Sequence, residues 1–163
     1  VHSPHYADVT SLVSDVIYNA PKGFAVHIRE HPLHAGRYDA SMYKLIEISD
    51  RALIDNDSSL FDFLDGASTV VVNNSTSGLE AMLRLKTVVI LGNAYYANED
   101  IAYLLDKRSS LQSILLESVS KPIPVENLIR YLQWLLLDKL ISGHFQDKNL
   151  KNADQVMARL SIV

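Results

Sequence analysis

The segment Thr69–Leu91, TVVVNNSTSGLEAMLRLKTVVIL, decides the fold class of this chain. It begins and ends with short, continuously apolar runs rich in valine and isoleucine, at 69–72 and 87–91. Such runs are typical of strands that are buried on both faces of a sheet. Between them, Ser77 opens a stretch whose apolar residues are spaced as on a helix. Strand, helix and strand in this order indicate a crossover between two parallel strands.

The same alternation continues on both sides of this segment. Short β-rich runs predict strands at 24–29 and 52–54. Apolar spacing predicts helices at 9–17, at 39–49 with Asp39 near its start, at 109–118 and at 125–136. A further helix is expected to be capped by Ser58, to hold Leu60, Phe61 and Leu64, and to end at Gly66. We therefore expect a Rossmann-like, three-layer α/β/α fold with one parallel sheet over residues 1–141. A polar tail with a short helix near Ala153–Leu160 is expected at 142–163, after a stop at Ser142-Gly143.

The composition is that of an ordinary globular domain. The 163 residues are 48% apolar and 21% charged, so the chain can bury a core. The net charge is −4, which argues against a broad surface for nucleic acid. There is no cysteine, and this excludes a disulfide scaffold, a cysteine nucleophile and a thiolate metal site.

The sequence contains no stretch suited to crossing a bilayer. Its longest apolar run, Ile101–Leu105, has five residues, whereas a membrane-spanning helix needs about 20. The opening, VHSPHYAD, has neither an initiator Met nor a signal sequence. We therefore expect a fragment of a longer, cytoplasmic protein.

Polar residues collect where the predicted strands end. Parallel strands place their carboxyl ends at one edge of a sheet, and ligands of open α/β sheets bind beyond that edge. We therefore expect these residues to form a single rim. The segments that follow the predicted strands are Glu30–His34, Asp55–Ser58, Asn73–Gly78 and Gly92–Tyr96.

The third of these segments, NNSTSG, predicts an anion site. The start of a helix offers free backbone N–H groups, Ser75 and Thr76 add hydroxyl donors, and Gly78 allows a ligand to approach the backbone. Neither a P-loop nor a GxGxxG fingerprint is present. The alternative is a capping box of Ser77 and Glu80 in which nothing binds. Both interpretations hold together if Ser77 caps the helix while Ser75 and Thr76 face a ligand.

Other polar residues allow a functional and a structural interpretation. His31 with Pro32 predicts a donor to a phosphate oxygen beside an apolar ring face, or else a strand terminator with an incidental histidine. His27 alternates with apolar residues and is expected in the core. No histidine spacing indicates a metal site, so none is predicted. Two further pairs stay open: Asp55 and Asp57 as cation ligands or as capping residues, and Tyr95 and Tyr96 as a stacking platform or as packing.

Two segments together carry a resemblance to a known family. HIREHPLHAGRYD, residues 27–39, and VVVNNSTSGLEAMLRLKTVVILGNAYY, residues 70–96, resemble the capsule polysaccharide synthesis family. Those bacterial proteins are similar to β-Kdo (3-deoxy-manno-octulosonic acid) glycosyltransferases, which build the lipid-linked Kdo linker of capsules. The resemblance covers about residues 1–140, with Arg29 where the family often has Lys.

The resemblance implies a binding site for a CMP-sugar donor, with CMP-Kdo expected. The implied binding residues are His31, Pro32, Asn74, Ser75, Thr76, Ser77, Gly78 and Glu80. Among them, His31 is expected to stabilise the departing phosphate, and Glu80 either contacts the ribose or caps its helix. Neither a cofactor nor a metal is implied.

Glycosyltransferases of this GT-B type have two Rossmann-like domains with the active site between them. The chain resembles the C-terminal, donor-binding half, so the acceptor site and the catalytic carboxylate are expected outside it. Alone it is expected to bind nucleotide weakly and to transfer nothing. The implied acceptor is a glycolipid or an oligosaccharide. The implied location is the cytoplasm, or the inner face of the cytoplasmic membrane if the full-length enzyme associates with it peripherally.

Two other functions fit the same residues. One is a nucleotide-sugar epimerase-like GT-B domain, which uses a UDP-sugar and is separated from the first by its preference for UDP over CMP. The other is a non-enzymatic module that recognises a glycan or an export component. That module predicts no nucleotide binding and tolerance of Ser75→Ala.

Overall fold

The structure is a computed structural model, and it describes residues 4–106 and 109–139. The chain divides into two compact units, Val1–Leu128 and Ile129–Val163. The first unit contains both segments of the family resemblance and is described below.

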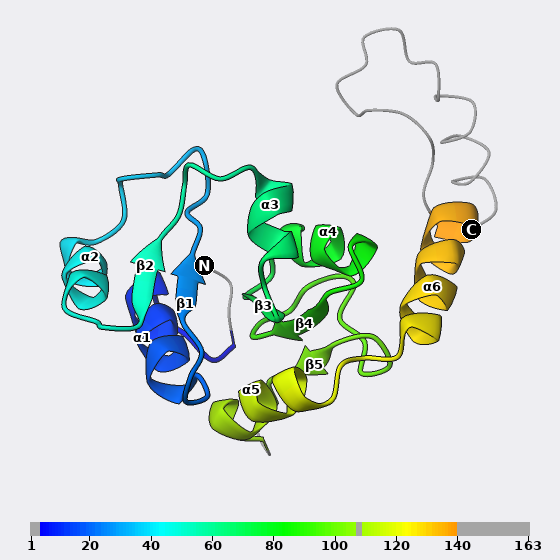
Figure 1. The fold of residues 1–163 in the computed structure, drawn as a ribbon. Coiled ribbons are helices and arrows are strands. Elements are labelled where there is room, and N and C mark those ends of the chain that lie inside the picture. The colour runs from blue at the N-terminus through cyan, green and yellow to red at the C-terminus, as the bar shows by residue number, and fades with distance from the viewer. Residues whose placement is uncertain (1–3, 107–108, 140–163) are drawn as a thin grey trace, which may run out of the picture. The chain divides into compact units, whose positions relative to one another are not determined.

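Helices and strands alternate along the first unit, as predicted (Figure 1). Their bounds are α1 Val9–Asn19, β1 Val26–Ile28, α2 Ala40–Glu47, β2 Ala52–Ile54, α3 Leu60–Asp65, β3 Thr69–Val72, α4 Ser77–Leu83, β4 Thr87–Ile90, β5 Tyr103–Leu104 and α5 Leu111–Ser120. The chain then enters α6, Val125–Trp134, and the π-helix η1, Leu135–Lys139. The α/β class and its Rossmann-like alternation are confirmed.

The strands are parallel but form two hydrogen-bonded sheets instead of the one expected. β1 pairs with β2, and a separate sheet has the order β3-β4-β5. The register sets Thr69 opposite Thr87 and Val26 opposite Ala52. β5 was not predicted, because two residues are too few to show a periodicity. Its residues lie within the apolar run Ile101–Leu105.

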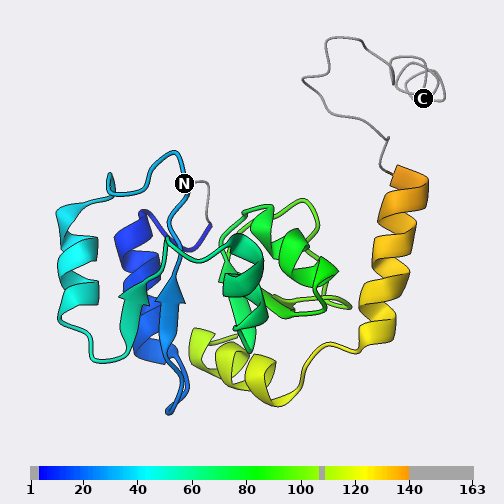
Figure 2. The same ribbon diagram turned by 45° about the horizontal axis from the view of Figure 1, so that its top comes forward.

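Helices cover the three-stranded sheet on both faces. Figures 1 and 2 show α4 on one side of β3 and β4, and α5 on the other. β4 lies between them and is buried along its whole length. The side chains of Val88 and Val89 have no exposed surface. Burial on both faces explains why the strand is continuously apolar in sequence.

The two sheets share a hydrophobic core although they do not pair. One cluster joins Val16 of α1 to Val89 of β4 and Leu115 of α5, with Val26 of β1 and Val71 of β3 packed against it. A second cluster lies between α1 and α2, over the β1-β2 sheet. Its buried members are Val13, Ile17, Met42 and Ile46. Packing through α1 therefore holds the first sheet to the second.

Helix caps and strand faces correct three local expectations. Ser59, not Ser58, caps α3, because Ser58 instead donates its hydroxyl to Asp55 Oδ2 at 2.7 Å. Asp39 lies at the start of α2 as predicted and accepts a hydrogen bond from Ser41 N–H.

His27 is exposed, not in the core, because side chains alternate along a strand and its neighbours in β1 take the inner face. The strand predicted at 24–29 is shorter, since only 26–28 pair with β2.

The stop at Ser142-Gly143 and the short helix near Ala153–Leu160 lie outside the described residues. Within 4–106 and 109–139, no helix has the length and apolar character to span a membrane.

Neighbouring leucines of α5 provide a direct test of the shared core. Leu115 is 4% exposed and belongs to the cluster beneath β4, whereas Leu116 is 55% exposed. Leu115→Ala should lower the free energy of unfolding by about 2–5 kcal/mol. Leu116→Ala should change it by about 0.5 kcal/mol or less. Urea denaturation followed by circular dichroism measures both, and equal losses would contradict this packing.

Candidate functional site

The loops at the strand ends are joined in two pairs by the contacts of the structure. The loop after β1 meets the loop after β2, through Glu30 and Asn56. The loop after β3 meets the loop after β4, through Ser75 and Tyr96. The single rim expected from one sheet is therefore built as two hydrogen-bonded halves, one for each sheet.

The turn before α4 is organised by Ser75. Its Oγ accepts hydrogen bonds from Ser77 N–H at 3.2 Å and from Ser77 Oγ–H at 2.8 Å. A hydroxyl has two acceptor positions and one proton, so the Ser75 proton is left to donate outward. Ser75 is exposed, and a ligand can reach it. This hydroxyl is the best-defined donor of the turn.

The capping-box alternative is wrong, because Ser77 lies inside the helix. Thr76 is the N-cap of α4, and its side chain makes no capping hydrogen bond. Thr76 is exposed beside Ser75. Gly78 N–H bonds to Ser75 O at 3.2 Å, and Ser77 N–H is bound as well. The donors that the turn offers to an anion are thus its hydroxyls more than its first backbone N–H groups.

Tyr96 supports this turn from the buried side. Its side chain is 1% exposed, and its hydroxyl donates to Ser75 O. A Cβ added to Gly78 would collide with the Tyr96 hydroxyl and lie 3.0 Å from Val72 Cγ2. Glycine is therefore required here for packing inside the protein, and not for the approach of a ligand as expected, because Gly78 is buried. Of the two tyrosines that sequence left open, Tyr96 is packing, whereas Tyr95 is 69% exposed and free to meet a ring. Sequence pattern alone gave no sign of the Tyr96 hydrogen bond.

A buried acceptor lies at the end of β3. Asn73 Oδ1 is buried and has no hydrogen-bond partner among the described residues. Gly92, after β4, packs against it so closely that a Cβ would lie 2.9 Å from Asn73 O. Buried polar atoms are nearly always bonded, so this acceptor is an exception among the described residues. Asn74, the next residue, is exposed.

His31 is exposed at the end of β1, beside the exposed Pro32. Its Nδ1 accepts a hydrogen bond from Leu33 N–H at 3.2 Å. The proton of the neutral imidazole is therefore on Nε2, which becomes a donor. The His34 ring lies 5.4 Å away, centroid to centroid. The ring is thus held in the tautomer that a phosphate oxygen needs.

Behind His31, Glu30 is buried and fully engaged. Its carboxylate accepts from Tyr43 Oη at 2.5 Å, from Asn56 Nδ2 at 2.6 Å and from Gly36 N–H at 3.2 Å. Burial alone would raise the pKa of Glu30, but these three hydrogen bonds outweigh it and hold the pKa below its ordinary value. Glu30 is therefore a carboxylate at neutral pH. Sequence reasoning placed it at the rim without a role.

Asp55 behaves as a capping residue and not as a free ligand. Its carboxylate accepts from Asp57 N–H, Ser58 N–H and the Ser58 hydroxyl. The hydrogen bonds from Ser58 hold the pKa of Asp55 below its usual range. Within residues 4–106 and 109–139, no group of three or more histidines or carboxylates is arranged to hold a metal ion.

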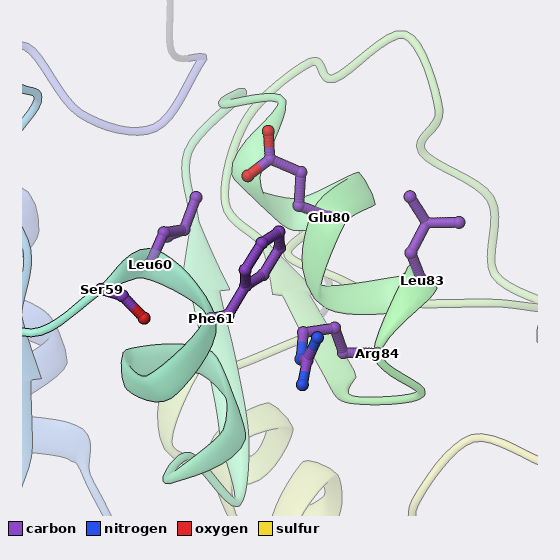
Figure 3. A pocket seen from close by; sticks show the side chains of 6 residues that line it. All are labelled: Ser59, Leu60, Phe61, Glu80, Leu83 and Arg84. Carbon is purple, nitrogen blue, oxygen red and sulfur yellow. The ribbon is translucent and has the colours of Figure 1, made fainter.

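Glu80 faces a pocket between α3 and α4 (Figure 3). The cavity has a volume of about 610 Å³, and the Phe61 ring stands opposite Glu80 and Arg84. The Arg84 guanidinium lies 5.0 Å from the centre of that ring and is paired with Asp65. Glu80 Oε2 is buried and has no hydrogen-bond partner in the described part of the chain. The pocket thus has an aromatic wall, and Glu80, which also lines it, has one buried carboxylate oxygen without a partner in the described part of the chain.

Residues 1–112 match the model of a family described as "Capsule polysaccharide biosynthesis protein". This match covers the His31 loop and the Ser75 turn together. No solved structure matches the chain.

The chain is similar to two curated proteins. The chain is 30% identical over 107 residues to the Capsule polysaccharide export protein KpsS of Escherichia coli, covering 60% of this chain and 28% of KpsS. It is 28% identical over 162 residues to Protein FixF of Sinorhizobium fredii (strain NBRC 101917 / NGR234), covering 96% of this chain and 38% of FixF. The chain therefore spans well under half the length of either relative.

The close fit of Gly78 is testable by adding one methyl group. Gly78→Ala should lower the free energy of unfolding by about 1–3 kcal/mol, because the new Cβ is forced into Tyr96 and Val72. Gly66→Ala is the matched control, because its Cβ would meet its nearest atom at 3.5 Å. Thermal unfolding of both variants measures the difference. A Gly78→Ala protein as stable as Gly66→Ala would contradict the described turn.

The low pKa of Glu30 predicts an acid-sensitive fold. A carboxylate whose pKa is lower in the folded than in the unfolded chain stabilises the fold above the unfolded value and loses that contribution as the pH falls through the folded value. The free energy of unfolding should therefore drop as the pH falls below about 4.5, the ordinary value for Glu30. Urea titrations between pH 7 and pH 3 measure the slope. Glu30→Gln should make it shallower, and an unchanged slope would contradict the assigned pKa.

Proposed function

The chain belongs to the capsule polysaccharide biosynthesis family, and from that premise we propose that residues 1–141 form the donor-binding half of a bacterial GT-B glycosyltransferase. The proposed donor is a CMP-sugar, with CMP-Kdo as the first candidate. The observation that carries the proposal is the Ser75 hydroxyl, whose acceptor positions are filled by Ser77 and whose proton is free to donate. A phosphate oxygen is a fitting acceptor for it.

The proposed mechanism is electrostatic stabilisation of the leaving group. As the bond between the sugar and CMP breaks, negative charge grows on the departing phosphate. Hydrogen bonds from His31 Nε2–H and from the hydroxyls of Ser75 and Thr76 lower the energy of that charge. Donors that are already oriented cost little reorganisation at the moment of reaction, which is why they accelerate it. This role requires neither a cofactor nor a metal.

The other residues of the proposed site bind the nucleoside. Glu80, which is half-buried and lines the pocket between α3 and α4, accepts from a ribose hydroxyl through its carboxylate. Pro32 offers an apolar face, whereas Gly78 is buried against Tyr96 and Val72 and supports the turn without touching the ligand. Asn74 and Ser77 complete the loop around the phosphate.

The acceptor and the cellular location belong to the same proposal. The acceptor is a glycolipid or an oligosaccharide, bound by a second domain that also supplies the catalytic carboxylate. The enzyme works in the cytoplasm, at the inner face of the cytoplasmic membrane, where a lipid-linked acceptor is accessible.

Titration of this chain with CMP, with UDP as the control, tests the proposal. Amide chemical shifts should move with CMP at His31 and at 75–80, and much less with UDP. Shifts with UDP alone would favour the epimerase-like function. Silence with both nucleotides at millimolar concentration would overturn nucleotide binding and favour an assembly module, which the word "export" in the name of KpsS also suggests.

His31→Ala in the full-length enzyme measures the leaving-group role. Loss of one such donor should lower kcat by about 10²–10³, with no change in the unfolding temperature, because the side chain is exposed. His27→Ala is the matched control, since His27 is an exposed histidine of β1 away from the loop. Wild-type turnover in the His31 variant would remove His31 from the mechanism.

A further inference from the structure

We propose that Glu30 is a positioning residue, whose buried carboxylate fixes the loop of His31 and so the direction of His31 Nε2–H. The inference rests on the proposed function in one respect, which is that His31 contacts the phosphate of the donor. Glu30 itself does not touch the ligand in this proposal. It acts through the hydrogen bonds that follow.

Glu30 ties together segments that are distant in the sequence. It is 7% exposed at the end of β1. Asn56, from the loop after β2, makes two hydrogen bonds with Glu30. Its Nδ2 donates to the carboxylate at 2.6 Å, and its Oδ1 accepts from Glu30 N–H at 3.1 Å. Gly36 N–H reaches both carboxylate oxygens, at 3.2 and 3.3 Å. The loop 31–35 is thus closed at both ends on one side chain.

A second set of hydrogen bonds runs from Glu30 to the backbone of His31. Tyr43 donates its hydroxyl to Glu30 Oε1 at 2.5 Å and accepts Tyr38 N–H at 3.2 Å. The Tyr38 hydroxyl in turn accepts His31 N–H at 3.4 Å. Tyr43 lies on α2, a helix fixed in the core by the buried Met42. The His31 backbone is therefore linked to α2 through Tyr38 and Tyr43, and Glu30 fixes the Tyr43 hydroxyl on which both links depend.

The chemistry of this network requires a carboxylate. Three donors converge on Glu30, from Tyr43, Asn56 and Gly36, and an ionised carboxylate accepts them all because it carries no proton. A glutamine would place an N–H₂ group against one of these donors. A buried charge stabilises a fold less well than an apolar residue that fills the same space. Stability alone therefore does not explain the buried Glu30 carboxylate, whereas a role in positioning His31 does.

A charge-conserving exchange separates positioning from mere stability. Glu30→Gln sets its amide against Asn56 Nδ2, and the double variant Glu30→Gln with Asn56→Asp restores a donor facing an acceptor. In the double variant, the carboxylate introduced at position 56 still accepts the N–H of residue 30, and the total charge is that of the wild type. Glu47→Gln is the control, because Glu47 is an exposed glutamate of α2.

The first readout is the His31 ring itself, without a ligand. The ¹⁵N shifts of its two ring nitrogens report the tautomer, and the Leu33 amide reports the bond to Nδ1. In Glu30→Gln the two ring ¹⁵N shifts should move toward the averaged values of free histidine, and the Leu33 amide shift should change with them. In the double variant all three signals should return to their wild-type positions. Glu47→Gln should leave them unchanged. Unmoved ring shifts in a folded Glu30→Gln protein would overturn the proposal.

One further variant and a second readout complete the test. If Glu30→Gln does not fold, Tyr43→Phe removes one link of the same network and should move the His31 signals in the same direction; no movement overturns the relay. CMP affinity should fall about tenfold in Glu30→Gln, the loss expected for one hydrogen bond to a charged group, and recover in the double variant. If wild type binds no CMP, the proposed function fails while the ring shifts still decide the positioning.

Discussion

Burial of β4 on both faces is the constraint on which the rest of the first unit depends. Thr87–Ile90 is enclosed between α4 and α5, so its neighbours can be joined to it only by crossovers that pass over a face of the sheet. Each crossover returns the chain to the same end of the sheet. The polar segments Asn73–Gly78 and Gly92–Tyr96 are placed together by this requirement, and Ser75 meets Tyr96 as a result.

The two halves of the candidate site are rigid for different reasons. The Ser75 turn is held by packing, because the buried Tyr96 side chain occupies the space that a Cβ at Gly78 would need. The His31 loop is exposed from residue 31 to residue 37, so packing contributes little to its position, and the hydrogen bonds from Gly36 N–H to Glu30 hold it instead. The proposed function needs both halves to be preorganised, and residues outside the proposed ligand contacts provide this order in each half.

Much of the fold could be predicted because its signals are local. Each of these signals lies within one short segment of the sequence. They are the continuous apolar runs of β3 and β4, the helical spacing of apolar residues in α1 and the aspartate at the start of α2. The family resemblance rests on the same two segments. Errors arose where a local pattern allows two outcomes. Alternation places His27 on one of two faces, adjacent serines compete for the cap of α3, and a two-residue strand has no pattern at all.

By itself, the sequence determined the α/β class, the parallel strands and the set of loops in which polar residues gather, since these follow from hydrophobic periodicity. Only the tertiary structure decided how the loops are paired, that the sheet is divided between β2 and β3, and that Glu30, Tyr43 and Tyr96 hold the candidate site. Those hydrogen bonds join residues 13 and 21 positions apart. Their geometry depends on how helices pack on the sheets, and no spacing within a single segment encodes it.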